Sequence, residues 1–194
     1  MSIDVVHRPS DGNWIAPVEP RLAPHFCLAL LMASCALASF AVACAPPFAA
    51  FAAFAAAMLP LPSALLVIGA AWVVNQAIGF GALGYPVDAN TILWGVAIGV
   101  AAEIATVTSA LTLRIVDRAS RSSAIVLALV TGYASYEAVL FAFTPALGGA
   151  GAFTFAIVGR LAILNVLWMI GLLAVCGIAR LAVAIRHRLA RTLF

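Results

Sequence analysis

The stretch PPFAAFAAFAAAMLPLP, residues 46–62, decides how many helices this chain places in a membrane. Its prolines enclose a segment of about 12 residues, which forms only ~18 Å of α-helix. The hydrocarbon core of a bilayer is ~30 Å thick. We therefore expect the segment at about 48–59 to be either a short span at a locally thinned site or a re-entrant half-helix.

The rest of the chain consists mainly of longer apolar runs. Of its 194 residues, 65% are hydrophobic and 9% are charged, whereas soluble proteins are ~25% charged. The mean hydropathy is +1.16. The runs are continuous rather than alternating, which argues against a β-barrel. Five clear spans are expected, at about 25–44, 63–83, 91–116, 122–144 and 153–184.

The sequence therefore predicts an all-α, polytopic helical membrane protein with about six membrane helices, the short segment included. Residues 1–22, which contain several prolines, are predicted to form a polar N-terminal tail. Residues 23–186 are predicted to form a single helical membrane domain, and residues 187–194 a basic C-terminal tail.

The arginines predict the orientation in the membrane. All ten basic residues are Arg, and most lie at the ends of predicted spans. Under the positive-inside rule, the Arg clusters at 114–121 and 180–191 both face the cytoplasm. This predicts a cytoplasmic C-terminus and a bacterial inner (cytoplasmic) membrane. The N-terminus lies outside with five spans and inside with six; Arg8 and Arg21 favour the inside, and hence six.

Three ionisable residues lie well within the predicted spans: Glu103, Glu137 and Arg160. A charge at the centre of a span costs roughly 2.5–3.5 kcal/mol, so such residues usually face the bundle interior and have partners. Glu137 and Arg160 each lie about 10 Å below the outer end of their helices, counted by helical rise. Because these helices are consecutive and antiparallel, we predict an ion pair between the two side chains.

Other polar and aromatic residues are expected at a similar depth. Trp72, Asn75 and Gln76 share one helical face, and Tyr133, Tyr136 and Glu137 share another. Gly95, Gly99 and Glu103 form a stripe with four-residue spacing, which allows a neighbouring helix to approach closely. Together these residues outline an outward-facing polar and aromatic pocket for a small polar or zwitterionic molecule. Its predicted substrate-binding residues are Trp72, Asn75, Gln76, Trp94, Glu103, Tyr133, Tyr136, Glu137 and Arg160.

Each of these residues also has a structural interpretation, which the sequence leaves open. Glu137 and Arg160 can act as a clamp, and Asn75 and Gln76 can hydrogen-bond one helix to another. Trp94 is also typical of a residue that anchors a helix at the membrane interface. Glu103 can be a proton-coupling group or a neutral hydrogen-bond donor.

No known catalytic or metal-binding motif is present in the sequence. The four Cys residues have no CxxC spacing, the three His are not clustered, and no HExxH, Walker or GxSxG pattern occurs. The sequence has no basic patch interleaved with aromatic residues, so no nucleic-acid partner is predicted. We expect no cofactor and no metal, and we favour an intramembrane enzyme least.

Two functions remain. The first is a small-solute transport protein, or the substrate-binding membrane subunit of an importer, with the outward-facing pocket as its site. In size, helix count, cytoplasmic C-terminus and pocket, this layout resembles the S components of energy-coupling factor importers. The resemblance implies an ATPase module as partner, docked on a small-residue face such as Ala29, Ala33 and Ala36. The second is a non-transporting structural or assembly subunit of a larger membrane complex, surrounded by lipid and other membrane subunits.

Overall fold

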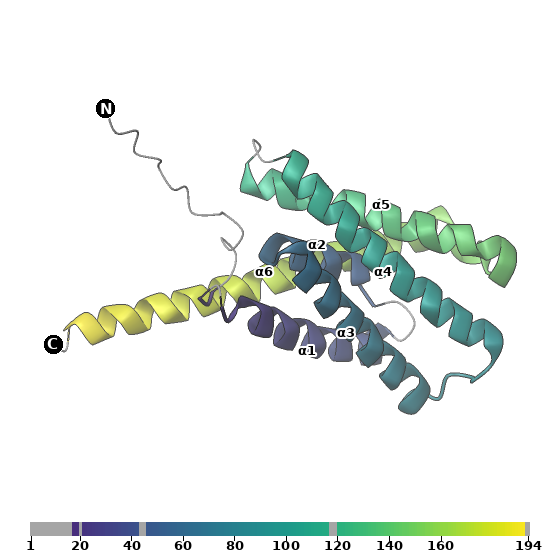
Figure 1. Ribbon diagram of the computed structural model, residues 1–194, viewed down its shortest axis with the longest axis horizontal. Helices are drawn as coiled ribbons and strands as arrows, with labels where there is room; N and C mark the ends of the chain where they lie inside the picture. The colour runs from purple at the N-terminus through teal and green to yellow at the C-terminus, as the bar shows by residue number, and fades with distance from the viewer. Residues whose placement is uncertain (1–16, 20, 43–45, 117–119, 193–194) are drawn as a thin grey trace.

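The computed structural model describes residues 17–19, 21–42, 46–116 and 120–192. These residues form six α-helices and one short 3-10 helix, with no strand (Figure 1). The elements are α1 (Ala23–Val42), α2 (Phe48–Met58), α3 (Leu61–Gly81), α4 (Ala89–Ile115), α5 (Arg121–Leu147), η1 (Ala150–Ala152) and α6 (Phe155–Thr192).

All α-helices except α2 are long and apolar enough to cross a membrane. The predicted all-α polytopic membrane protein is therefore confirmed. Most of the predicted N-terminal tail, namely residues 1–16 and 20, lies outside the described residues. The predicted basic tail begins at residue 187, but α6 continues as a helix through Thr192.

Local sequence sets where several helices begin. Pro60 precedes α3, which also has Pro62 in its first turn, where a missing N–H costs nothing. Asp88 caps α4 by accepting hydrogen bonds from the Thr91 N–H at 2.9 Å and the Thr91 hydroxyl at 3.0 Å. These bonds, the N–H bond above all, hold the pKa of Asp88 below its usual value.

The directions of the helices follow from contacts between them. Helices α3 and α4 are antiparallel, because Gln76 lies at Gly95, Trp72 at Gly99 and Gly69 at Glu103. The chain then reverses from α4 to α5, and again from α5 to α6. Helix α1 is antiparallel to α6: Cys27 lies near Cys176, while Ala41 and Val42 lie near residues 156–167. Helix α1 is therefore parallel to α3.

Two ends of the bundle can now be defined. The Gly84 end holds the α3–α4 and α5–α6 connections, and the Arg114 end holds the α4–α5 connection. Helices α1 and α3 both begin at the Arg114 end, so the chain between them must return there from the Gly84 end. Ala23 and the C-terminal end of α6 consequently lie at the same end of the bundle, as expected for six crossings.

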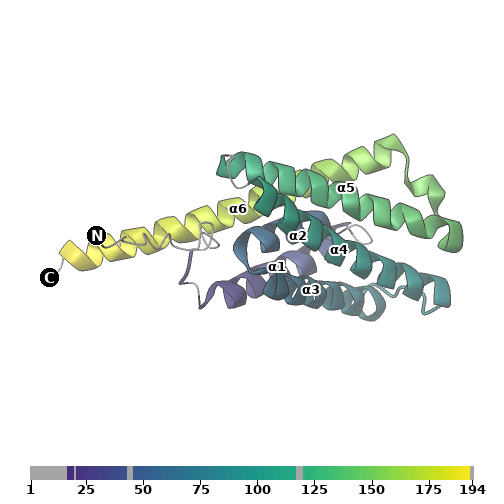
Figure 2. The same ribbon diagram turned by 45° about the horizontal axis from the view of Figure 1, so that its top comes forward.

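Helix α2 completes that return from the centre of the bundle (Figures 1 and 2). It contacts all five other α-helices, and every residue except Ala56 is buried. Phe48, Phe51 and Phe54, spaced by three, are at most 1% exposed. Helix α2 is thus neither at the surface nor a full-length span.

The N-terminus of α2 is capped by the last helix. The Ala50 N–H donates to Asn165 Oδ1 at 2.9 Å, and Asn165 Nδ2 donates to the Leu161 carbonyl at 2.9 Å. Asn165 lies ten residues beyond Phe155, which is ~15 Å along α6. Helix α2 therefore begins near half the ~30 Å depth of a hydrocarbon core and runs to the Arg114 end.

Helix α6 is much longer than its neighbours, about 57 Å for its 38 residues. Its buried residues Asn165, Met169, Leu172 and Cys176 form one stripe with steps of three and four. None of residues 177–185 is buried. Figures 1 and 2 both show the C-terminal part of α6 extending past the other helices.

The cap predicts the effect of removing the Asn165 amide. Asn165→Leu keeps the side-chain volume but leaves the buried Ala50 N–H unpaired, which costs about 1–3 kcal/mol. Reversible unfolding in mixed detergent micelles should show this loss. Val166→Leu, an exposed neighbour with the same introduced side chain, should unfold like wild type. Equal stability of both variants would show that the cap contributes nothing.

Candidate functional site

The predicted pocket residues occupy separate places in the structure. Trp72, Asn75, Gln76 and Glu103 lie where α3 packs against α4 and α1. Tyr133, Tyr136 and Glu137 lie on α5, whose Tyr133 reaches α6. Trp94 lies at the Gly84 end, against the α5–α6 connection. Arg160 lines a cavity between α6 and the end of α1.

Two glycines hold α3 and α4 close together. Trp72 Nε1 donates to the Gly95 carbonyl at 2.7 Å, and the Trp72 ring covers Gly99. A Cβ atom at Gly99 would lie only 2.9 Å from that ring. The Gln76 amide packs in the same way against Gly95. The close approach predicted from the glycine spacing is confirmed, and Trp72 fills the space it leaves.

The Asn75 side chain links α3 to α1. Its Nδ2 donates to Ser39 Oγ of α1 at 3.0 Å, and its Oδ1 accepts from Gln76 Nε2 at 3.1 Å. Asn75 is only 6% exposed. Its amide is thus occupied by one bond to α1 and one within α3, which is the structural role that the sequence left open beside ligand binding.

Glu103 faces α3, as its place on the glycine stripe predicts. Its Oε1 lies 3.2 Å from the position that a Cβ of Gly69 would take. Its Oε2 is buried and has no hydrogen-bond partner among the described residues. The missing side chain of Gly69 therefore makes the room for a carboxyl group between two membrane helices.

Glu137 lies beside Tyr133, one turn away on α5, and the two side chains interact. The Tyr133 hydroxyl donates to the Val158 carbonyl of α6 at 2.6 Å. Glu137 Oε1 is buried and has no hydrogen-bond partner within the described part of the chain. Tyr136 is 8% exposed and packs in the apolar core.

The predicted ion pair between Glu137 and Arg160 is wrong. Arg160 is exposed and lines a cavity where no described lining residue is acidic. The rotation of α6 explains the error. Helix α6 turns Asn165 toward α2, and Arg160, five residues earlier, then points about 140° away from that direction. The depth estimate from helical rise says nothing about this rotation.

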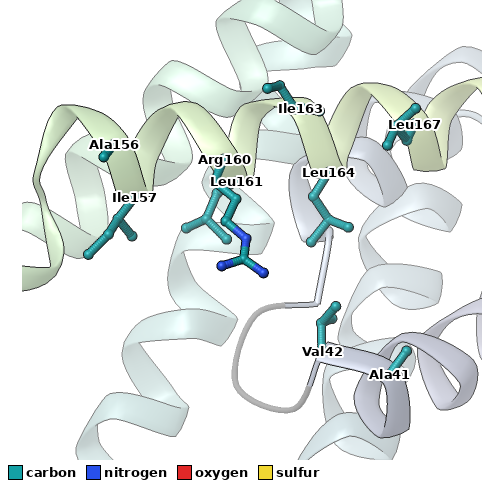
Figure 3. Close-up of a pocket in the computed structure, with 9 residues that line it drawn as sticks. All are labelled: Ala41, Val42, Ala156, Ile157, Arg160, Leu161, Ile163, Leu164 and Leu167. Carbon is teal, nitrogen blue, oxygen red and sulfur yellow. The ribbon is translucent and has the colours of Figure 1, made fainter.

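The cavity lies between the end of α1 and the first half of α6 (Figure 3). Its volume is about 720 Å³ and it is open on one side. Arg160 is the charged side chain among the described residues that line it, and its guanidinium points toward Ala41 and Val42. The lining is otherwise apolar: Ala41, Val42, Ala156, Ile157, Leu161, Ile163, Leu164 and Leu167.

Of the nine residues predicted to bind substrate, Arg160 lines this cavity. The apolar lining residues were missed because aliphatic residues facing a cavity look the same in sequence as residues facing lipid. The α5–α6 connection lies against Trp94 at Gly149. Gly148 and Gly149 have φ values of 78° and 84°, which favour glycine at both positions.

The described residues contain no group of three His, Cys, Asp or Glu side chains that could hold a metal ion. Cys27, Cys35 and Cys176 are buried free thiols. No protein-family model, curated protein or solved structure matches the chain. The cavity and the side chains around it are therefore the basis for proposing a function.

The α3–α4 contact predicts a marked difference between two glycine substitutions. Gly99→Ala places a methyl group against the Trp72 ring and should destabilise the protein by about 1–3 kcal/mol. Gly171→Ala, on α6 where nothing lies within 4 Å of the new Cβ, should be neutral or slightly stabilising. Thermal unfolding in detergent measures both. A Gly99→Ala variant as stable as Gly171→Ala would contradict this packing.

The observed position of Arg160 predicts that it has no energetic coupling to Glu137. In a double-mutant cycle of Glu137→Gln and Arg160→Gln, the two changes in unfolding free energy should add to within about 0.5 kcal/mol. Glu137→Gln alone should destabilise little, because the amide has the shape of the carboxyl group and keeps an oxygen beside Tyr133. A coupling energy several times larger would show that the two side chains do form an ion pair.

Proposed function

We propose that the protein binds and transports a small organic anion, as a carrier or as the substrate-binding membrane subunit of an importer. The observation that carries the proposal is Arg160, a cation within a span whose side chain points into the cavity. A cation there is costly, and such residues commonly mark substrate or ion pathways. The volume of about 720 Å³ suits a small molecule, since ligand sites measure ~300–1,000 Å³.

The lining suggests the chemistry of the solute. A guanidinium donates paired hydrogen bonds to a carboxylate or a phosphate. The aliphatic side chains around it favour an apolar body. The proposed solute therefore carries one acidic group on an apolar frame, rather than the small polar or zwitterionic molecule first expected from the sequence.

The proposal includes a location and a partner. Arg114 and the C-terminal Arg cluster lie toward the same end of the bundle, which supports a cytoplasmic C-terminus in a bacterial inner membrane. Ala29 and Ala33 are exposed on α1, which leaves that face open to an ATPase module of the kind that energy-coupling factor importers use.

A structural or assembly subunit is the second candidate. Its supporting observation is that Trp72, Asn75 and Gln76 are bonded to or packed against neighbouring helices. In that role, Arg160 would contact another subunit rather than a solute.

A solute screen separates the two functions. Organic anions, zwitterions and neutral analogues are added to the purified full chain, and thermal unfolding is followed. An anion at ~100 times its Kd should stabilise by about 2.7 kcal/mol, which raises Tm by roughly 5–10 °C. Arg160→Gln should abolish the shift, whereas Arg114→Gln, an exposed arginine outside the cavity, should keep it.

The screen also has a clear negative outcome. If no solute stabilises the protein, or if Arg160→Gln responds like wild type, the transport proposal fails and the structural candidate replaces it.

A further inference from the structure

The charge and the apolar wall of the cavity lie at different depths along α6. Arg160 is five residues beyond Phe155, or ~8 Å from the start of the helix. Leu164 and Leu167 lie further along the same wall, and Leu167 is ~18 Å from the start. The charge therefore lies in the half of the cavity nearer the Gly84 end, beside the apolar Ala156 and Ile157, and the wall toward the middle of the bundle is wholly apolar.

The opening of the cavity lies on the lipid-facing side of α6. Three residues that line it, Ile157, Ile163 and Leu167, are 42%, 63% and 60% exposed. Exposed aliphatic residues on a membrane span contact acyl chains rather than water. A molecule can thus enter the cavity sideways from the bilayer, with Ala41 and Val42 of α1 on its other side.

We propose that the cavity binds one acidic phospholipid taken from the surrounding bilayer. Its phosphate lies on the Arg160 guanidinium and one acyl chain follows Leu164 and Leu167. This inference rests on the proposed function and names its substrate class. The two parts of such a lipid match the two parts of the lining, its phosphate suiting the Arg160 guanidinium and its acyl chain the aliphatic side chains. The net negative charge compensates a cation that has no acidic neighbour among the described lining residues.

The test uses the full chain, purified in detergent and examined by native mass spectrometry after mixing with dioleoylphosphatidylglycerol or dioleoylphosphatidylcholine. We expect one phosphatidylglycerol to stay bound per chain and phosphatidylcholine to be lost. Arg160→Gln should lower phosphatidylglycerol occupancy about tenfold, and Arg160→Lys should restore part of it. Arg114→Gln should bind like wild type.

A second variant tests the apolar wall without touching the charge. Leu164→Trp fills the cavity and should displace the lipid while Arg160 remains. Size-exclusion profiles identify any variant that fails to fold, and the conclusion then comes from the other one.

Three results would overturn the inference. Equal phosphatidylglycerol binding by wild type, Arg160→Gln and Leu164→Trp would mean that the lipid lies elsewhere on the surface. Binding of hexanoate through Arg160, without phosphatidylglycerol, would reject the lipid but keep the proposed function. Failure of all these probes, together with the solute screen, would reject both.

Discussion

The hydrogen bond between the Ala50 N–H and Asn165 fixes the element on which the rest of the structure depends. It holds the N-terminus of α2 at mid-depth, where no water is available to satisfy a backbone donor. From there the short helix contacts all the other α-helices. Its phenylalanines fill the centre of the bundle, and its alanines let the longer helices approach closely.

The fold class could be predicted because a bilayer imposes a length on every full span. The α3–α4 contact could be predicted as well, since Gly95 and Gly99 repeat at helical spacing. The place of α2 could not, because an apolar segment of this length fits both alternatives. What decides it is the parallel relation of α1 and α3, a tertiary property with no local sequence signal.

The positions of the candidate site residues were harder to predict from the sequence, for a geometric reason. Helical rise gives the depth of Glu137 and Arg160, but rotation about the α6 axis decides whether their side chains meet. The face that carries Asn165 toward α2 sets that rotation. It leaves Glu137 Oε1 without a partner among the described residues and turns Arg160 toward α1. Amides such as Asn75 are equally suited to ligands and to helices, so composition alone could not assign them.

The spacing of Ala50 and Asn165 has a consequence for biosynthesis. The two residues are separated by 115 positions in the chain, and chains are synthesised and inserted from the N-terminus. While α1 to α5 emerge, the partner of the Ala50 N–H has not yet been made. Helix α2 is too short to be a stable span by itself, and the bond that caps its N-terminus can form only after the last helix has been made. The backbone donor at the centre of the bundle is therefore satisfied only at the end of translation.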